Sequence, residues 1–197
     1  MRVSIFNYNV GNLYSLQAAL KREHAEPIVT KKIREVRAAD AVLLPGVGSI
    51  REAARRLPRD EIKDMVRAGK PLLGICLGLQ LFFDRSEEGP GKGLQLFPGE
   101  VKRLPSTVKI PQIGWNTVNI KQQNEFVEQL PEKSWVYYVH SYYPSTEGPW
   151  VTATSEYGLE YPVIVAERNV LGTQFHPEKS GDVGRTVLRN FIRSIRR

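Results

Sequence analysis

Short apolar runs and amphipathic stretches alternate through the first part of the chain. Four apolar runs have the length of strands: residues 3–8, 28–30, 41–44 and 72–76. Four further stretches repeat their apolar residues at helical spacing: 12–23, 50–56, 60–68 and 77–83. Strands that alternate with helices in this way are typical of a parallel sheet with helices on both faces.

The pattern changes after Gly89-Pro90-Gly91. Six stretches alternate in polarity or carry bulky aromatic residues, which predicts strands: 93–97, 115–120, 135–143, 151–157, 163–167 and 170–175. The amphipathic stretch 182–196 predicts a closing helix. Without a repeat or a low-complexity linker, we expect one α/β domain over residues 1–197. Its mostly parallel central sheet, flanked by helices, should carry an antiparallel extension from about residue 93 to residue 170.

Composition and charge narrow the class of protein. The chain of 197 residues is 41% hydrophobic and 25% charged, as expected of a globular protein. The formal charge of +7 raises nucleic acid as a partner, but the basic residues lie beside no aromatic-rich or metal-binding motif. No leader and no apolar run long enough to span a bilayer is evident, and a single cysteine suits a reducing compartment. We therefore expect a soluble cytoplasmic protein that binds neither membranes nor nucleic acid.

Cys76 lies between glycines at a predicted strand-to-helix turn. In Gly74-Ile75-Cys76-Leu77-Gly78 the small neighbours permit a strained turn that exposes the cysteine, as in the nucleophile elbow. The following helix favours negative charge on the sulfur. The N–H of Leu77 is expected to point to where an oxyanion develops. A buried and inert cysteine is the commoner case, however, so a second motif is needed to decide.

That second motif is Gln174-Phe175-His176-Pro177-Glu178. A strand delivers the histidine, and the carboxylate two positions later can reach its outer ring nitrogen. This contact holds the tautomer whose inner nitrogen takes a proton from a thiol. A histidine in a strand is more often structural than catalytic. Together with the glycine-flanked cysteine, however, the motif predicts a triad of Cys76, His176 and Glu178.

The remaining histidines are weaker candidates for a functional role. His140 lies in Val139-His140-Ser141-Tyr142, at the end of a long aromatic strand, so its neighbours are candidates for shaping a substrate pocket. Three dispersed histidines and one cysteine provide no pair of metal ligands at usable spacing. The sequence therefore predicts no metal site.

Segments 74–80 (GICLGLQ) and 175–178 (FHPE) closely resemble the class I, triad-type glutamine amidotransferases, and the resemblance extends over nearly the whole chain. It implies that Cys76 attacks the glutamine carboxamide, that His176 carries the proton to departing ammonia, and that Glu178 orients the histidine. It implies no metal or organic cofactor. Narrower segments resemble glutaminase subunits that serve histidine biosynthesis: 9–13, 44–48, 111–116, 139–142 and 176–181.

The resemblance also assigns substrate and oxyanion positions. The positions expected at the substrate are Gly48, Gln80, Glu88, Ser141 and Tyr142. Val47 and Leu77 are expected to supply the two oxyanion N–H groups. A flip of the Gly46–Val47 peptide must come first, and the glycines on both sides make such a flip easy.

By the same resemblance, the ammonia passes to a cyclase subunit built as a (β/α)₈ barrel, which forms a heterodimer with this chain. Residues 9–12, 111–115 and 137–138 are candidates for the docking surface, with core packing as the alternative. Three other functions stay open. They are an amidotransferase subunit for pyridoxal phosphate, anthranilate or GMP synthesis, a free cysteine hydrolase, and a basic nucleic-acid-binding module.

Overall fold

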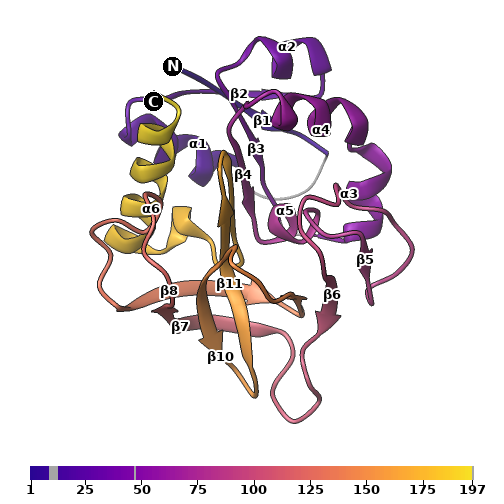
Figure 1. Ribbon diagram of the computed structural model, residues 1–197, viewed down its shortest axis with the longest axis vertical. Coiled ribbons are helices and arrows are strands. Elements are labelled where there is room, and N and C mark those ends of the chain that lie inside the picture. Colours follow the sequence, from indigo (N-terminus) through magenta and orange to yellow (C-terminus); the bar gives the residue numbers. More distant parts are fainter. Residues whose placement is uncertain (9–12, 47, 197) are drawn as a thin grey trace.

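A nine-stranded mixed sheet, in the order β2-β1-β3-β4-β12-β11-β10-β7-β8, forms the centre of the computed structural model, which describes residues 1–8, 13–46 and 48–196 (Figure 1). Five neighbouring strands are parallel: β1 (Arg2–Phe6), β2 (Glu26–Thr30), β3 (Ala41–Leu44), β4 (Leu72–Ile75) and β12 (Val170–Thr173). Four strands extend the sheet in antiparallel fashion: β7 (Gln112–Ile120), β8 (Lys133–His140), β10 (Val151–Glu156) and β11 (Glu160–Glu167). A second sheet contains β5 (Arg85–Ser86), β6 (Glu100–Arg103) and β9 (Tyr142–Ser145).

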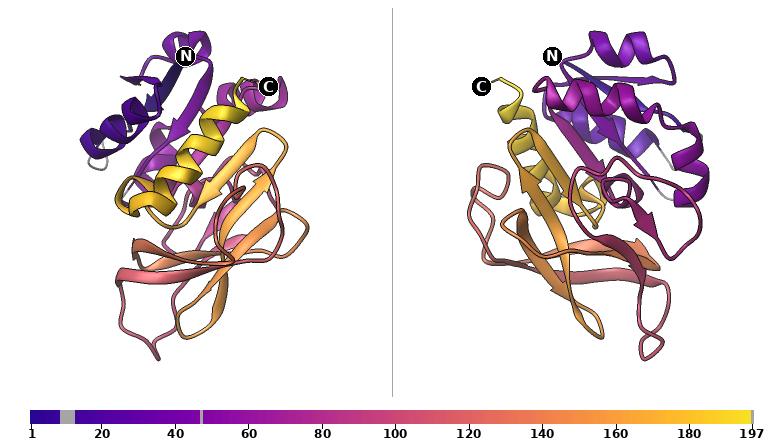
Figure 2. Two further views of the ribbon diagram at one scale, coloured as in Figure 1. Left: turned by 90° about the vertical axis from the view of Figure 1, so that its left-hand side faces the viewer. Right: turned by 45° about the vertical axis from the view of Figure 1, so that its right-hand side comes forward.

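Helices cover both faces of the parallel part (Figure 2). One face carries α1 (Leu13–Arg22) and α6 (Gly181–Ser194). The other face carries α2 (Ile33–Ala38), α3 (Ile50–Arg56), α4 (Arg59–Arg67) and α5 (Leu77–Gln80). None of the helices in the described ranges is long and apolar enough to cross a membrane.

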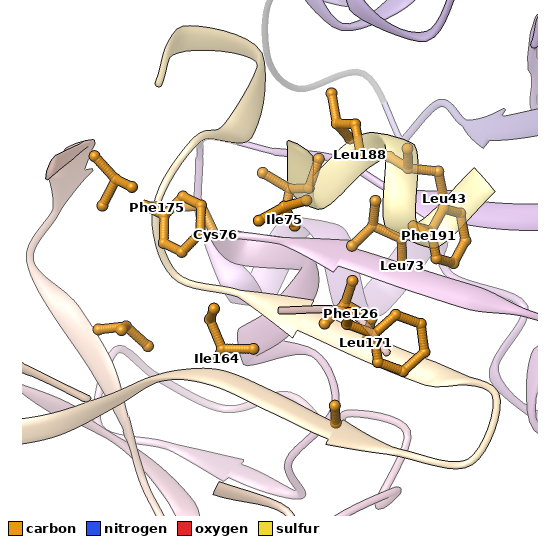
Figure 3. Close-up of a cluster of buried hydrophobic side chains, with 14 of the residues drawn as sticks. Leu43, Leu73, Ile75, Cys76, Phe126, Ile164, Leu171, Phe175, Leu188 and Phe191 are labelled. Carbon is orange, nitrogen blue, oxygen red and sulfur yellow. The ribbon is translucent and has the colours of Figure 1, made fainter. Parts of the chain in front are cut away.

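Strands β3 and β4 contain no polar residue because both of their faces are buried. In β3, Leu43 belongs to the hydrophobic cluster with Phe191 of α6, whereas its neighbour Val42 belongs to the cluster on the α3 and α4 side. Figure 3 shows Leu43 and Leu73 beside Phe191 in the first of these clusters. Alternate residues of one strand thus serve two cores, which is why the run 41–44 lacks a polar position. The predicted α/β class, with a mostly parallel sheet and an antiparallel extension, is confirmed.

The strand predicted over residues 93–97 is wrong. Gln95 has a left-handed φ of 53°, which interrupts an extended chain. The N–H groups of Leu94 and Leu96 donate to the carbonyls of Leu81 and Phe82, at 2.6 and 2.8 Å. The segment therefore packs along the turn that follows α5 instead of pairing with a strand.

Two predicted elements are divided or shortened. The strand predicted over 135–143 is two strands, because β8 ends at His140 and β9 begins at Tyr142 in the second sheet. The helix predicted over 77–83 ends at Gln80. The short elements α2, β5 and β6 were not predicted. The chain therefore changes sheet at Ser141, next to the residues expected at the substrate.

Candidate active site

Cys76 lies in a strained turn at the carboxyl end of β4. Its φ of 53° and ψ of −103° place a non-glycine residue in a sparsely populated conformation, at a cost of about 1–3 kcal/mol. Its N–H donates to the carbonyl of Thr173 in β12 at 2.7 Å, and its carbonyl accepts from the N–H of Gln80 at 3.1 Å. The turn is thus tied to the sheet on one side and to α5 on the other.

The glycines beside Cys76 lie where no side chain fits. A Cβ on Gly78 would lie 1.9 Å from the carbonyl oxygen of Leu44, and a Cβ on Gly74 would lie 2.6 Å from the carbonyl oxygen of Gly78. These contacts show how closely α5 approaches β3 and β4. The sequence pattern around the cysteine is therefore required by the close packing that holds the turn.

His176 and Glu178 follow β12, the strand that pairs with β4. Nδ1 of His176 lies 2.9 Å from Oε1 of Glu178, and the two side chains are only 3% and 7% exposed. The backbone N–H of His176 donates to the carbonyl of Tyr137 in β8 at 3.0 Å. Nε2 of His176 is buried and has no hydrogen-bond partner among the described residues, so it is the ring nitrogen left for proton exchange.

The charge state of His176 follows from its neighbours. Burial alone lowers its pKa, but hydrogen bonding and charge interactions with Cys76 and Glu178 outweigh burial and raise the pKa above its ordinary value. These contacts therefore favour the charged form of the imidazole. No hydrogen bond of ordinary geometry joins it to Cys76 in the described part of the chain, and such catalytic contacts often tighten only when substrate binds.

Cys76 lines a pocket of about 250 Å³. Ligand pockets commonly measure about 300–1,000 Å³, so this one suits a small molecule. Its lining includes Leu77 and all five positions expected at the substrate, namely Gly48, Gln80, Glu88, Ser141 and Tyr142. His176 and Glu178 are buried and are not among the lining residues. Within the described ranges, no group of three or more His, Cys, Asp or Glu residues could hold a metal ion.

The backbone N–H of Leu77, an expected oxyanion donor, is engaged by a carbonyl of the protein. It donates to the oxygen of Gly46 at 3.3 Å. Gly46 and Gly48 have φ values of 151° and 133°, in the region that favours glycine. Val47, the other expected donor, lies outside the described residues. The Leu77 donor is therefore not free in this conformation.

Gln80 and Glu88 are held by protein groups as well. Nε2 of Gln80 donates to the carbonyl of Tyr142 at 2.8 Å and to Oε1 of Gln174 at 3.2 Å. Both N–H groups of this amide are thereby used, which leaves its oxygen as an acceptor. Oε2 of Glu88 accepts the N–H of Ile50 at 2.9 Å, at the start of α3. Hydrogen bonds to the protein thus hold the NH₂ group of Gln80 and one carboxylate oxygen of Glu88 in place at the pocket.

Sequence reasoning gave no role to Gln174, whose Nε2 donates to Sγ of Cys76 at 3.4 Å. The available signal was its position two residues before His176, because alternate side chains of an extended chain share a side.

His140 is a neutral buried histidine. Its pKa is lowered to about 4, chiefly by burial and to a smaller extent by the nearby charge of His176, while the hydrogen bond to Tyr142 acts in the opposite direction. Its Nδ1 donates to the carbonyl of Tyr142 at 2.9 Å, and its Nε2 lies 3.3 Å from the hydroxyl of Tyr161. That hydroxyl donates its single proton to Oε1 of Gln112 at 2.7 Å. The ring therefore fixes a carbonyl at the pocket wall.

The family model for class-I glutamine amidotransferases matches residues 5–195, which shows the class. Two curated relatives carry the name imidazole glycerol phosphate synthase subunit HisH. The protein of Methanosarcina mazei is 45% identical over 197 residues, which cover 97% of this chain and 98% of that protein. The protein of Bacillus cereus strain G9842 is 45% identical over 194 residues, 96% and 93% of the two chains. The chain therefore belongs to the class-I glutamine amidotransferases, within the family of HisH subunits.

A solved structure described as a glutamine amidotransferase has the same fold. It superposes with a TM-score of 0.77 at 20% identity and covers 99% of each chain.

His140 should make the fold acid-sensitive. The unfolded chain binds a proton at this residue near pH 6.5 and the folded chain only near pH 4, so the free energy of unfolding falls as the pH falls between them. The full difference is about 3 kcal/mol. Urea unfolding at several pH values should show that His140→Asn loses less stability than the wild type across this window. Parallel losses would contradict the assignment of a neutral ring.

Proposed function

We propose that this chain is the glutaminase subunit of imidazole glycerol phosphate synthase. It hydrolyses glutamine to glutamate and ammonia and passes the ammonia to a cyclase subunit. That subunit forms imidazole glycerol phosphate and the by-product AICAR in histidine biosynthesis. The observation that carries the proposal is the strained turn of Cys76 beside the buried pair of His176 and Glu178, in a chain 45% identical to HisH subunits.

The proposed reaction runs through a thioester. His176 takes the proton of the Cys76 thiol, the sulfur attacks the carbonyl carbon of the glutamine side-chain amide, and His176 passes that proton to the departing ammonia. Water then adds to the γ-glutamyl thioester as His176 takes one of its protons. The carbon–sulfur bond breaks, glutamate leaves, and His176 returns the proton to the sulfur. Glu178 keeps the imidazole oriented and favours its charged form through the 2.9 Å contact.

The pocket offers groups that suit the amino-acid end of glutamine. The free oxygen of the Gln80 amide and the carboxylate of Glu88 are acceptors, which match a positively charged α-amino group. Ser141, Tyr142 and Gly48 line the same pocket.

The Gly46 carbonyl suggests how the reaction is restrained. While this carbonyl occupies the N–H of Leu77, the oxyanion lacks one donor. Loss of a donor costs about 2.7–4 kcal/mol of transition-state stabilisation, or about 10²–10³ in rate. Rotation of the Gly46–Val47 peptide would free the Leu77 N–H. We infer that the cyclase subunit favours this rotation, so that ammonia is released only when an acceptor is present.

An exposed set of apolar residues is the proposed docking surface for the cyclase barrel. Ile113, Trp115 and Trp135 are 63%, 54% and 59% exposed, and Trp115 pairs across the strands with half-buried Tyr137. We name these four residues the aromatic face. Large exposed apolar patches commonly mark protein interfaces. The carbonyl of Val139, further along β8, lies 3.7 Å from the Cys76 sulfur, so the face adjoins the pocket.

Tyr138, one of the candidate docking residues, is fully buried, so the alternative of core packing holds for it. It points to the opposite side of β8 from Tyr137, into the core, because side chains alternate along a strand. Residues 9–12 lie outside the described residues.

Replacing Cys76 with alanine should abolish glutamine-dependent synthesis in the complex with the cyclase. Synthesis from added ammonium salts should continue at the wild-type rate, because the thiol acts only in releasing ammonia. Assays of both reactions on the same preparation provide the internal control. Normal glutamine-dependent turnover by Cys76→Ala would show that the nucleophile is another group.

The isolated chain should hydrolyse glutamine slowly, and a ligand-bound cyclase should raise kcat by about 10²–10³, more than it lowers KM. Trp115→Ala should increase the cyclase concentration needed for half-maximal activation by about 30-fold, as expected for a central interface tryptophan. Steady-state kinetics with titrated cyclase measures both effects.

Arg67→Ala is the matched control, because this exposed arginine ends α4, far from β7 and β8 (Figure 1). It should leave the activation curve unchanged. Full kcat without a partner would contradict the restraint and favour a free hydrolase. An unchanged curve for Trp115→Ala would contradict the aromatic face as the docking surface.

A further inference from the structure

Gln174 is a buried polar residue with no part in the reaction described above. It is fully buried just after β12 and two residues before His176. Its Nε2 donates to the sulfur of Cys76 at 3.4 Å, and its Oε1 accepts from Nε2 of Gln80 at 3.2 Å. One amide therefore links a residue of the substrate pocket to the sulfur.

The direction of the Gln174 amide follows from a backbone carbonyl. The carbonyl oxygen of Tyr142 can only accept hydrogen bonds, so the Gln80 atom at 2.8 Å from it is the NH₂ group. The same nitrogen faces Gln174, which must therefore present its oxygen to Gln80. The NH₂ group of Gln174 is left to face the sulfur. His140 donates to the same Tyr142 carbonyl at 2.9 Å. It thereby fixes the carbonyl from which the hydrogen bonds run through Gln80 and Gln174 to the sulfur.

Among the described residues, a carbonyl and an amide N–H group contact the sulfur, and these two contacts respond differently to loss of its proton. The carbonyl of Val139, at 3.7 Å, can accept an S–H bond from the thiol but repels a thiolate. The N–H of Gln174 can donate to either form, and hydrogen bonds to a charged acceptor are stronger. Deprotonation therefore weakens the contact with Val139 and strengthens the contact with Gln174.

We propose that Gln174 is a positioning residue that holds the deprotonated sulfur of Cys76 in place for attack on the amide. Its bond to Gln80 connects this support to the pocket residue that receives the amino-acid end of the substrate. The inference rests on the proposed glutaminase function, in which Cys76 is the nucleophile. A purely structural role for Gln174 would affect the stability of the fold without changing the reactivity of the thiol.

Alkylation of the thiol tests the contact directly, because Cys76 is the single cysteine of the chain. Gln174→Met keeps the length of the side chain and removes the donor. In complex with the cyclase, iodoacetamide should label this variant about 10-fold more slowly at neutral pH, and its rate profile should shift to higher pH. The kcat for glutamine should fall by a similar factor of about 10, with little change in KM.

Asn190→Leu is the matched control. Asn190 also has a buried amide side chain, and its Nδ2 donates to the carbonyls of Phe126 and Glu128 rather than to the sulfur. Its replacement controls for the loss of a buried amide, and the alkylation rate of Cys76 should stay at the wild-type value.

Gln174→Glu keeps the acceptor for Gln80 and replaces the donor with a carboxyl oxygen. It should slow alkylation at least as much as Gln174→Met. If thermal melting shows that Gln174→Met does not fold, the alkylation rate of Gln174→Glu tests the positioning role instead. Wild-type alkylation rates in the folded variants, or an increase in KM without a loss of kcat, would overturn the proposal.

Failure of the positioning role of Gln174 can be distinguished from failure of the proposed glutaminase function, because alkylation requires no glutamine. Slower alkylation in a protein whose glutaminase activity survives Cys76→Ala would contradict the proposed function and leave the Gln174 contact standing. Normal alkylation of the Gln174 variants, in a protein whose activity requires Cys76, would overturn the positioning role alone.

Discussion

The backbone of Cys76 bends through a left-handed conformation, with φ of 53°, and every other group of the site is placed relative to this turn. Such a conformation costs about 1–3 kcal/mol and persists only where its surroundings enforce it. Here the N–H of Cys76 is bound to β12, and the packing of Gly78 against Leu44 leaves no room for relaxation. The strain is offset by β4, which is buried between two hydrophobic clusters. The rigid part of the fold thus fixes the sulfur beside the strand that leads to Gln174 and His176.

Strand β8 connects the aromatic face to the reacting groups. The carbonyl of Tyr137 accepts from the backbone N–H of His176 at 3.0 Å, and the N–H of Tyr137 donates to Oγ of Ser180 at 2.9 Å. Two residues later, the carbonyl of Val139 lies 3.7 Å from the sulfur. Side chains at 135 and 137 face outward from the same strand. A partner bound to this face would therefore contact a strand whose backbone bonds to both His176 and Cys76. Through this strand, binding of the partner can change the geometry of the reacting groups.

Much of the fold and part of the site could be predicted because local pattern and long-range packing agree there. Residues 41–44 and 50–56 form the predicted strand and helix, and the glycines around Cys76 indicated its turn. The missed features depend on contacts between distant segments. The pairing of 94 and 96 with the turn after α5 and the change of sheet at Ser141 leave no local signal. The spacing of Gln174 from His176 is a local signal, but its partners Cys76 and Gln80 lie 98 and 94 positions away, so its contacts could not be predicted.

Every step of the proposed reaction requires Cys76 to be the nucleophile. A glutamine analogue carrying a chloroketone in place of the carboxamide alkylates the group that attacks the amide carbon. Incubation with this analogue, followed by mass spectrometry of the digested chain, identifies the modified residue. The account predicts one label per chain on Cys76, loss of glutaminase activity in proportion to labelling, and protection by glutamine. Loss of activity with the label on another residue, or full activity with Cys76 labelled, would contradict it.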